Sequence, residues 1–182
     1  MIILLTGASH TGKTALSQKL LEKYHYPYLS IDHLKMGLIR SGNTNLTVCD
    51  DDALTQYLWP IVREMVKTAI ENGQNLIVEG CYIPFDWAAS FDESYCSHVR
   101  ALWLIMTPEY IETHFGDIQL HANDVEQRLD DSGLSKQWLQ EENEKNLAQC
   151  IRHDCSYILI EDDYDTAEAA DMFLNAEGAV CV

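Results

Sequence analysis

The sequence opens with Met1-Ile-Ile-Leu-Leu-Thr-Gly-Ala-Ser-His-Thr-Gly-Lys-Thr14, and the rest of the chain can be understood from this segment. Residues 1–6 are an apolar run typical of a buried strand, and residues 15–21 carry apolar side chains at helical spacing. Residues 7–14, between them, match the pattern G-x-x-x-x-G-K-[ST]. A strand, a glycine loop and a helix in this order are the context in which the pattern indicates a phosphate-binding loop.

The residue types of this loop suit a phosphate group. Gly7 and Gly12 permit backbone angles and a close approach that a Cβ atom would obstruct. The N–H groups of the loop and of the first helical turn can then point at phosphate oxygens. We predict that Lys13 reaches the β- and γ-phosphates and that the Thr14 hydroxyl binds Mg²⁺. The complete predicted nucleotide-binding segment is Gly7, Ala8, Ser9, His10, Thr11, Gly12, Lys13, Thr14 and Ala15.

A chance glycine-rich turn is the alternative explanation of this motif. With an average glycine usage of about 7%, two fixed glycines followed by Lys and Thr occur by accident in roughly one chain in a hundred of this length. The correct flanking segments lower that frequency further. We therefore expect a nucleotide-phosphate site here.

The composition is that of a globular protein. The chain is 47% hydrophobic and 23% charged, and we expect one domain over residues 1–182. Its apolar runs are short and no basic segment precedes the first strand, so we expect neither a membrane span nor a signal peptide. The net charge of −17 would repel a phosphate backbone, which argues against nucleic acid as a partner. It does not argue against ATP, because backbone dipoles form most of a phosphate pocket.

The cysteines indicate the redox compartment. Their positions, with no paired C-x-x-C spacing, are Cys49, Cys81, Cys96, Cys150, Cys155 and Cys181. We expect free thiols in a cytoplasmic protein. His153 lies between two of the cysteines, but the sequence offers too few further ligands at useful spacing for zinc, so we predict no structural metal.

Apolar runs alternate with segments of helical periodicity, which predicts an α/β fold with a parallel sheet and helices on both faces. The expected strands are residues 1–6, 28–31, 75–79, 99–106 and 156–160. The expected helices are residues 15–24, 33–40, 53–71, 108–115, 135–152 and 167–174. Pro60 should kink or break the third of these helices.

The segment after the second strand supplies candidates for catalysis. Ligands of open parallel sheets bind beyond the carboxyl ends of the strands, and Asp32 occupies that edge. We predict that Asp32 is a catalytic residue facing the γ-phosphate, although capping of the following helix would also explain it. Lys35 and Arg40 lie on roughly the same helix face and are predicted to bind the substrate.

The end of the third strand supplies a second carboxylate. Glu79 stands where a Walker-B acid belongs, so it could hold Mg²⁺ through water, or bind a substrate hydroxyl; simple exposure is the alternative. The following loop is rich in aromatic residues. Tyr82 is a predicted substrate contact, whereas Phe85 and Trp87 either line the acceptor site as well or cover the sheet edge.

A polar insertion separates the fourth and fifth strands. We predict that residues 116–134 form a small lid, because nucleotide kinases keep a mobile segment at this place. Arg128 is the only arginine of the insertion and is predicted to act in catalysis by supplying a cation to the phosphate in the transition state. An ion pair with neighbouring carboxylates would explain this arginine equally.

These features resemble the P-loop kinases related to adenylate kinase, from Met1 to about Leu174. The resemblance implies a three-layer P-loop NTPase fold whose five-stranded parallel sheet has the order 2-3-1-4-5, with a lid before the last strand. The segment Tyr28-Leu-Ser-Ile-Asp-His-Leu-Lys35 is similar to the monophosphate-site segment of adenylate kinases, with a lysine where they carry an arginine. Asp32 and Ile-Val-Glu79-Gly are more similar to the group of zeta toxins, chloramphenicol phosphotransferase and 2-phosphoglycerate kinase, in which the aspartate accepts the proton of the acceptor hydroxyl.

Three functions remain open from the sequence. The first is an ATP- and Mg²⁺-dependent phosphotransferase that moves the γ-phosphoryl group to a hydroxyl of a small molecule, acting as a monomer or homodimer. The second is a nucleoside monophosphate kinase. The third is a nucleotide-binding switch that hydrolyses ATP slowly and acts through a protein partner.

Overall fold

The computed structural model describes residues 1–121, 134–162 and 166–175. Its strands are β1 (Ile2–Gly7), β2 (Tyr28–Ser30), β3 (Leu76–Glu79), β4 (Val99–Met106) and β5 (Tyr157–Ile160). Its α-helices are α1 (Lys13–Tyr24), α2 (Ile31–Arg40), α3 (Asp51–Glu71), α4 (Glu93–Cys96), α5 (Pro108–His121), α6 (Lys136–Arg152) and α7 (Thr166–Asn175). A short 3₁₀ helix spans Trp87–Ser90.

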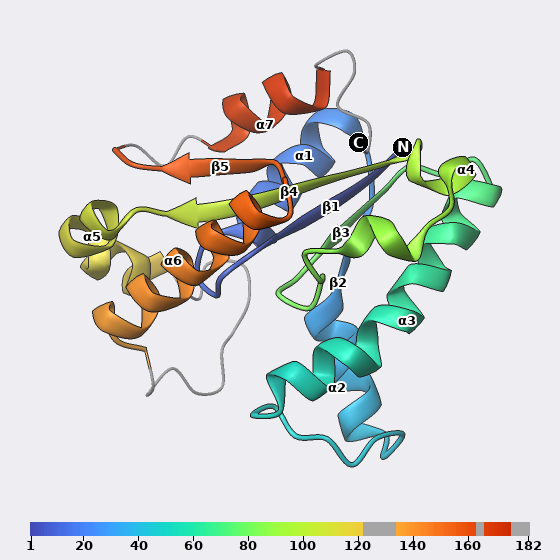
Figure 1. Cartoon of the computed structure of the whole chain (residues 1–182), viewed down its shortest axis with the longest axis horizontal. Helices are drawn as coiled ribbons and strands as arrows, with labels where there is room; N and C mark the ends of the chain where they lie inside the picture. Colours follow the sequence, from blue (N-terminus) through green and yellow to red (C-terminus); the bar gives the residue numbers. More distant parts are fainter. Residues whose placement is uncertain (122–133, 163–165, 176–182) are drawn as a thin grey trace.

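The strands form one all-parallel sheet in the order β2-β3-β1-β4-β5 (Figure 1). Because parallel neighbours need a crossover connection, helices separate the strands along the chain. The predicted α/β class, the parallel sheet and the order 2-3-1-4-5 are confirmed. The central strand β1 is buried along its whole length, as expected for a strand covered on both faces.

Two apolar clusters pack on the two faces of the sheet. Alternate residues of β1 point to opposite faces, so Ile2 and Leu4 belong to one cluster and Ile3 and Leu5 to the other. The first cluster includes the apolar stripe of α3 and the loop after β3. The second includes apolar residues of α1, α5 and α7. The sheet is thus the middle layer of three.

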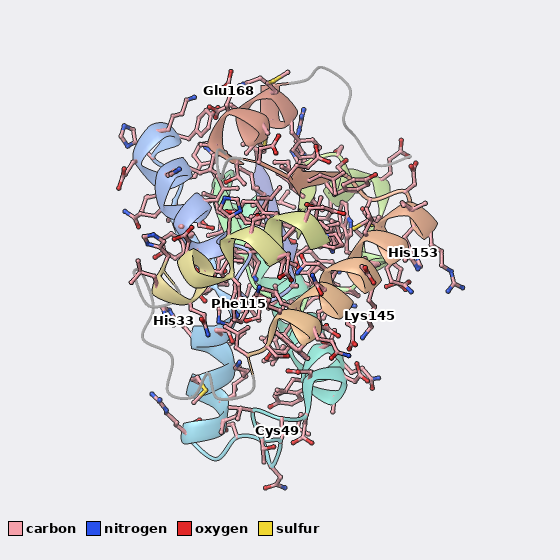
Figure 2. The ribbon with its side chains drawn as sticks, turned by 90° about the vertical axis from the view of Figure 1, so that its left-hand side faces the viewer. His33, Cys49, Phe115, Lys145, His153 and Glu168 are labelled. Carbon is pink, nitrogen blue, oxygen red and sulfur yellow. The ribbon has the colours of Figure 1, made fainter. Side chains whose placement is uncertain are left out.

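The elements that matter for the site lie at the end of the molecule opposite the last helix. Figure 2 shows α2, marked by His33, and the loop before α3, marked by Cys49, at one end, and α7, marked by Glu168, at the other. Figure 1 shows the same separation. Helices α5 and α6, marked by Phe115 and Lys145 in Figure 2, pack against one another.

Helix α3 covers the predicted range 53–71, whereas α5 extends beyond its predicted end. Helix α3 continues through Pro60, so this proline does not mark a break. Leu58 and Val62, on either side of it, are both fully buried and hold the two halves against the same face. Helix α5 runs on to His121 past a non-helical residue at His114, beyond the predicted end near residue 115. The first residues assigned to the lid are therefore helical, and residues 122–133 lie outside the described part of the chain.

The cysteines differ from the prediction at one position. Cys96 is disulfide-bonded, so the expectation of free thiols throughout the chain is wrong there. Which cysteines pair depends on what the fold brings together, and the C-x-x-C spacing used in the prediction does not report that. The free thiols among the described residues belong to Cys49, Cys81, Cys150 and Cys155.

Within the described ranges, none of the helices has the length and hydropathy that crossing a bilayer requires.

Candidate active site

The register of the sheet brings the predicted site residues to one edge. Gly7, the last residue of β1, lies opposite Leu104, and Glu79, the last residue of β3, lies opposite Leu5. Ser30, the last residue of β2, is paired with the same Glu79. The glycine loop, the start of α2 and the end of β3 therefore emerge side by side, beyond the carboxyl ends of the strands (Figure 1). This edge is where ligands of open parallel sheets bind.

The glycine loop has a backbone that depends on its glycines. Gly7 has a φ of +138°, and a Cβ atom there would lie 2.3 Å from the carbonyl oxygen of Leu104. Gly12 has a φ of 77° and His10 a φ of 66°, so two positions of the loop are left-handed. The Thr11 hydroxyl donates a hydrogen bond to the Ala8 carbonyl at 2.9 Å and ties the loop to itself. The loop is thus a tight turn whose backbone conformation depends on its glycines.

Lys13 begins α1 directly after this loop. Gly12 is the N-cap residue of α1. Because glycine has no side chain, the cap residue makes no side-chain hydrogen bond to the first N–H groups of the helix. The Lys13 side chain is buried among the loop residues, and its ammonium donates a hydrogen bond to the Ala8 carbonyl at 2.7 Å. A cation and the N-terminus of a helix at one place favour an anion such as a phosphate.

Thr14 and Glu79 form the candidate magnesium site. The Thr14 hydroxyl donates a hydrogen bond to Oε2 of Glu79 at 3.4 Å. Glu79 is only 2% exposed, so the alternative that it is a merely exposed end of a strand is wrong. A hydroxyl and a carboxylate oxygen side by side are hard ligands that suit Mg²⁺. The residues present therefore fit Mg²⁺.

Asp32 lies in the first turn of α2 and not at its cap. Helix α2 begins at Ile31 and has Ser30 as its N-cap residue, so the alternative that Asp32 serves only as a cap is wrong. The carboxylate of Asp32 is paired with the Lys35 ammonium, one helical turn along. The Asp32 side chain remains 36% exposed, whereas that of Lys35 is 12% exposed. Asp32 thus keeps access to an incoming molecule.

A chain of hydrogen bonds continues from this pair. The Lys35 ammonium also donates to the Tyr82 hydroxyl at 2.9 Å. The Tyr82 hydroxyl in turn donates to Oδ1 of Asp51 at 3.2 Å. Three elements therefore meet here, namely α2, the loop after β3 and the first residue of α3. Asp32, Lys35 and Tyr82 were predicted from the sequence, and the structure brings them together.

The charges of Asp32, Lys35 and Asp51 shift the pKa values of Lys35 and Tyr82. Desolvation lowers the pKa of Lys35, but the field of the Asp32 carboxylate and the hydrogen bond to it outweigh this effect, so the pKa is raised overall. Burial is the main cause that raises the pKa of Tyr82 to about 12; the Lys35 ammonium opposes the rise, and the carboxylates of Asp32 and Asp51 add to it. At neutral pH Lys35 is therefore a cation and Tyr82 a neutral donor.

Cys81 lies between the phosphate side and the Asp32 side. Its pKa is raised, first by desolvation and then by the charges of Asp32 and Glu79, while contact with the Lys13 ammonium lowers it. The residue is nevertheless exposed to solvent. Sequence reasoning missed Cys81, and its place directly after Glu79 was the available signal.

The remaining predicted residues have different outcomes. Trp87 is buried, and Phe85 stacks on Trp103 at a centroid distance of 5.5 Å, so these aromatic side chains cover the sheet. Arg40 is exposed at the far end of α2 and is not brought to Asp32. Arg128 lies outside the described residues. Asp51 was missed as a site residue, because the run of Asp50, Asp51 and Asp52 has the appearance of a helix start alone.

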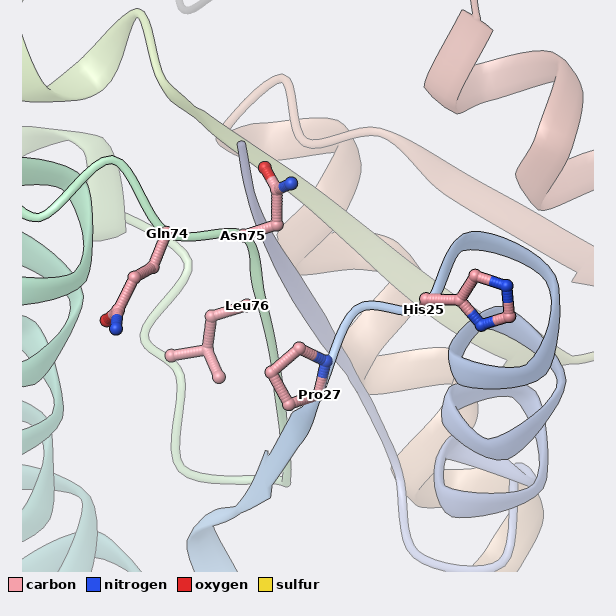
Figure 3. Close-up of a pocket in the computed structure, with 5 residues that line it drawn as sticks. All are labelled: His25, Pro27, Gln74, Asn75 and Leu76. Carbon is pink, nitrogen blue, oxygen red and sulfur yellow. The ribbon is translucent and has the colours of Figure 1, made fainter.

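A separate pocket lies at the opposite edge of the sheet. It is lined by His25, Pro27, Gln74, Asn75 and Leu76 (Figure 3). Pro27 precedes β2 and Leu76 begins β3, so the pocket borders the amino ends of these strands. It contains none of the phosphate-loop residues or carboxylates described above. We therefore assign the site to the carboxyl edge.

Solved structures, but no family model or curated sequence, resemble this chain. No family model matches the sequence, and no curated protein matches it in sequence. Solved structures do match. A sugar kinase from Janibacter sp. HTCC2649 has a TM-score of 0.55 at 15% identity, over 100% of this chain and 98% of that one.

Two further solved structures agree over nearly the whole chain. A shikimate kinase from Bacteroides thetaiotaomicron has a TM-score of 0.53 at 16% identity, over 96% of both chains. A deoxyadenosine kinase from M. mycoides has a TM-score of 0.53 at 14% identity, over 96% of this chain and 97% of that one. The chain therefore has the fold of the P-loop kinases of small molecules.

Proposed function

We propose that this protein is an ATP- and Mg²⁺-dependent phosphotransferase that moves the γ-phosphoryl group to a hydroxyl of a small molecule. The observation that carries the proposal is the position of Asp32. Its partly exposed carboxylate follows β2 at the same sheet edge as the phosphate loop and Glu79. A carboxylate beside a phosphate site is the group that a hydroxyl acceptor requires for alignment and proton removal.

On the nucleotide side, the backbone N–H groups of residues 8–14 and the Lys13 ammonium bind the phosphates. Thr14 and Glu79 would hold Mg²⁺, which would supply positive charge to neutralise the phosphates. The Lys13 ammonium donates to the Ala8 carbonyl within the loop, which keeps it beside the proposed phosphate site. Ala15 extends the predicted binding segment into the first turn of α1.

On the acceptor side, Asp32 accepts the hydroxyl proton at its carboxylate. Lys35 holds that carboxylate in position, and Tyr82 holds the Lys35 ammonium from the other side. Phosphoryl transfer depends on positioning and charge neutralisation, so a rigid chain of this kind is useful. Arg128 is proposed to add a cation from the lid, and Arg40 to contact a more distant part of the acceptor.

The names of the matching structures support this proposal. The three structures compared above are named as kinases of a sugar, of shikimate and of deoxyadenosine. These names describe kinases with different acceptors, so they support the reaction and leave the acceptor to experiment. No observation on the described residues favours a nucleoside monophosphate acceptor or a partner-binding switch over this reading.

The test is transfer of labelled γ-phosphate from ATP to pooled hydroxyl metabolites, followed by mass identification of the labelled product. We expect a labelled phosphate ester of a small molecule. Asp32→Asn should bind ATP with unchanged affinity and lose at least about 100-fold in turnover, because it removes a general base. Asp52→Asn, an exposed change on α3, is the matched control and should leave turnover unchanged.

Two results would overturn the proposal. One is release of inorganic phosphate without any labelled ester across the whole pool, which would favour the switch. The other is near-normal transfer by Asp32→Asn, which would remove the base assignment. Label found only in nucleoside diphosphates would instead establish the monophosphate kinase.

A further inference from the structure

The charges at the acceptor end of the site point to a class of substrate. The acceptor end consists of Asp32, Lys35, Asp51 and Tyr82, which the hydrogen bonds described above connect. It contains two carboxylates and one ammonium. The group therefore carries a net negative charge.

The single ammonium of this group already has its partners. Lys35 is held by the Asp32 carboxylate, by the Tyr82 hydroxyl and by the Tyr82 ring, whose centroid is 5.0 Å from the ammonium. Its side chain is 12% exposed, so little of the ammonium surface is open to a new anion. An anionic substrate group would have to displace Asp32, the proposed base, from Lys35.

Several other cations of the described chain have partners away from the acceptor end. Arg63 and Lys67 pair with Glu64 on α3, Lys23 with Asp171, Lys136 with Glu112 and Lys145 with Glu142. Arg100 donates to the Phe173 carbonyl near the amino end of β4. Arg40 is eight residues after Asp32 on the same helix, which is about 12 Å along the axis at 1.5 Å per residue.

From this arrangement we infer that the phosphoryl acceptor carries no phosphate or carboxylate group next to the hydroxyl that reacts, and that it is a neutral or amine-bearing polyhydroxy compound. The inference rests on the proposed phosphotransferase function. Asp51 determines this preference. Its exposed carboxylate begins α3, is fixed by the Tyr82 hydroxyl, and repels an anion while attracting an amine.

The test uses acceptors matched in skeleton and different in charge. One set is glucose, glucosamine and glucose 6-phosphate; a second is glycerol, 3-amino-1,2-propanediol and glycerol 3-phosphate; a third is adenosine and adenosine monophosphate. Transfer of γ-label from ATP is measured for each, together with the product identified from the pooled metabolites. Wherever the protein phosphorylates a member of a set, we expect kcat/KM for the neutral or amine-bearing members of that set to exceed kcat/KM for the anionic member by at least about tenfold.

The role of Asp51 has its own test. Asp51→Asn should raise kcat/KM for an anion-bearing acceptor about fivefold through the acceptor KM, since one nearby carboxylate in a solvated site has about this effect. The KM of ATP should not change. Asp52→Asn removes the same charge one residue further along α3 and should change neither value by more than about twofold.

The outcomes separate this inference from the proposed function. A labelled product whose acceptor carries a phosphate or carboxylate beside the new ester overturns the inference and leaves the phosphotransferase standing. Equal effects of Asp51→Asn and Asp52→Asn overturn the assignment of Asp51. Absence of label in every acceptor of every charge overturns both the function and the inference.

Discussion

Tyr82 connects the two carboxylates of the acceptor end, and its ionisation reports whether that connection exists. Its raised pKa means that the folded protein favours the protonated phenol over the phenolate. The stability that this group contributes is therefore complete below pH 10, the ordinary tyrosine value, and is lost as the pH rises through about 12.

The difference between the ultraviolet titration curves of the wild type and of Tyr82→Phe isolates the ionisation of Tyr82. We expect the difference to titrate near pH 12, the value to which burial raises this pKa. Near-ultraviolet circular dichroism recorded over the same range is the control that the chain is still folded. A difference curve centred near pH 10 in the folded protein would show that Tyr82 is not buried against Asp51 and Lys35.

Cys81 offers a chemical probe of the phosphate side. The residue is exposed, and its thiol lies beside the Lys13 ammonium and has a pKa that desolvation raises. Alkylation requires the thiolate, so its rate should rise about tenfold per pH unit from pH 7 to pH 9 without a plateau. Mg·ATP should slow the reaction, because bound phosphates would cover the thiol and engage Lys13.

Peptide mass spectrometry with and without nucleotide measures the modification at this cysteine alone. Cys81→Ser is the control that assigns the modified peptide. A rate at Cys81 that saturating Mg·ATP leaves unchanged would contradict the placement of this thiol beside the phosphates.

At the scale of a single element, the turn after β1 depends on Gly7. A Cβ atom there would lie 2.3 Å from the Leu104 carbonyl oxygen, on backbone that cannot move without separating β1 from β4. Gly7→Ala should therefore lower the free energy of unfolding by roughly 3 kcal/mol or more. Gly37→Ala, on α2 with nothing within 4 Å of the new atom, should raise it by roughly 0.5–1 kcal/mol.

Chemical denaturation of both variants measures the two changes. Each adds one methyl group, so the comparison isolates the backbone environment. Equal stabilities of the two variants would show that the turn after β1 is not held as described.

The sequence predicted most elements because their signals are local. The boundaries of β4 agree with the prediction, and Ser135 caps α6 through the Trp138 N–H as expected. The end of α5 was missed, because a polar segment hides that Ile118 is buried against the core. Helix α3 covers the predicted range 53–71, and the break offered as one outcome at Pro60 does not occur, since packing on both sides outweighs one lost hydrogen bond.

For the whole molecule, the sheet order was predicted from resemblance and not from the residues alone. Once that order is known, the site follows, because the parallel register places Asp32, Glu79 and the glycine loop at one edge. The contact of Tyr82 with Asp51 spans 31 residues and depends on how α3 packs, so no local pattern reports it. The contacts of the site that join residues distant in sequence are therefore the ones that only the structure reveals.

The central claim is that the loop between β1 and α1 binds the phosphates of a nucleotide through Lys13. Isothermal titration calorimetry of Mg·ATP against the wild type and Lys13→Ala tests it most directly. We predict one nucleotide bound per wild-type chain, and an affinity weakened roughly 10- to 100-fold in the variant, as expected for loss of a charged hydrogen-bond donor. Absence of binding heat with the folded wild-type protein, or equal affinities of the two proteins, would contradict the claim.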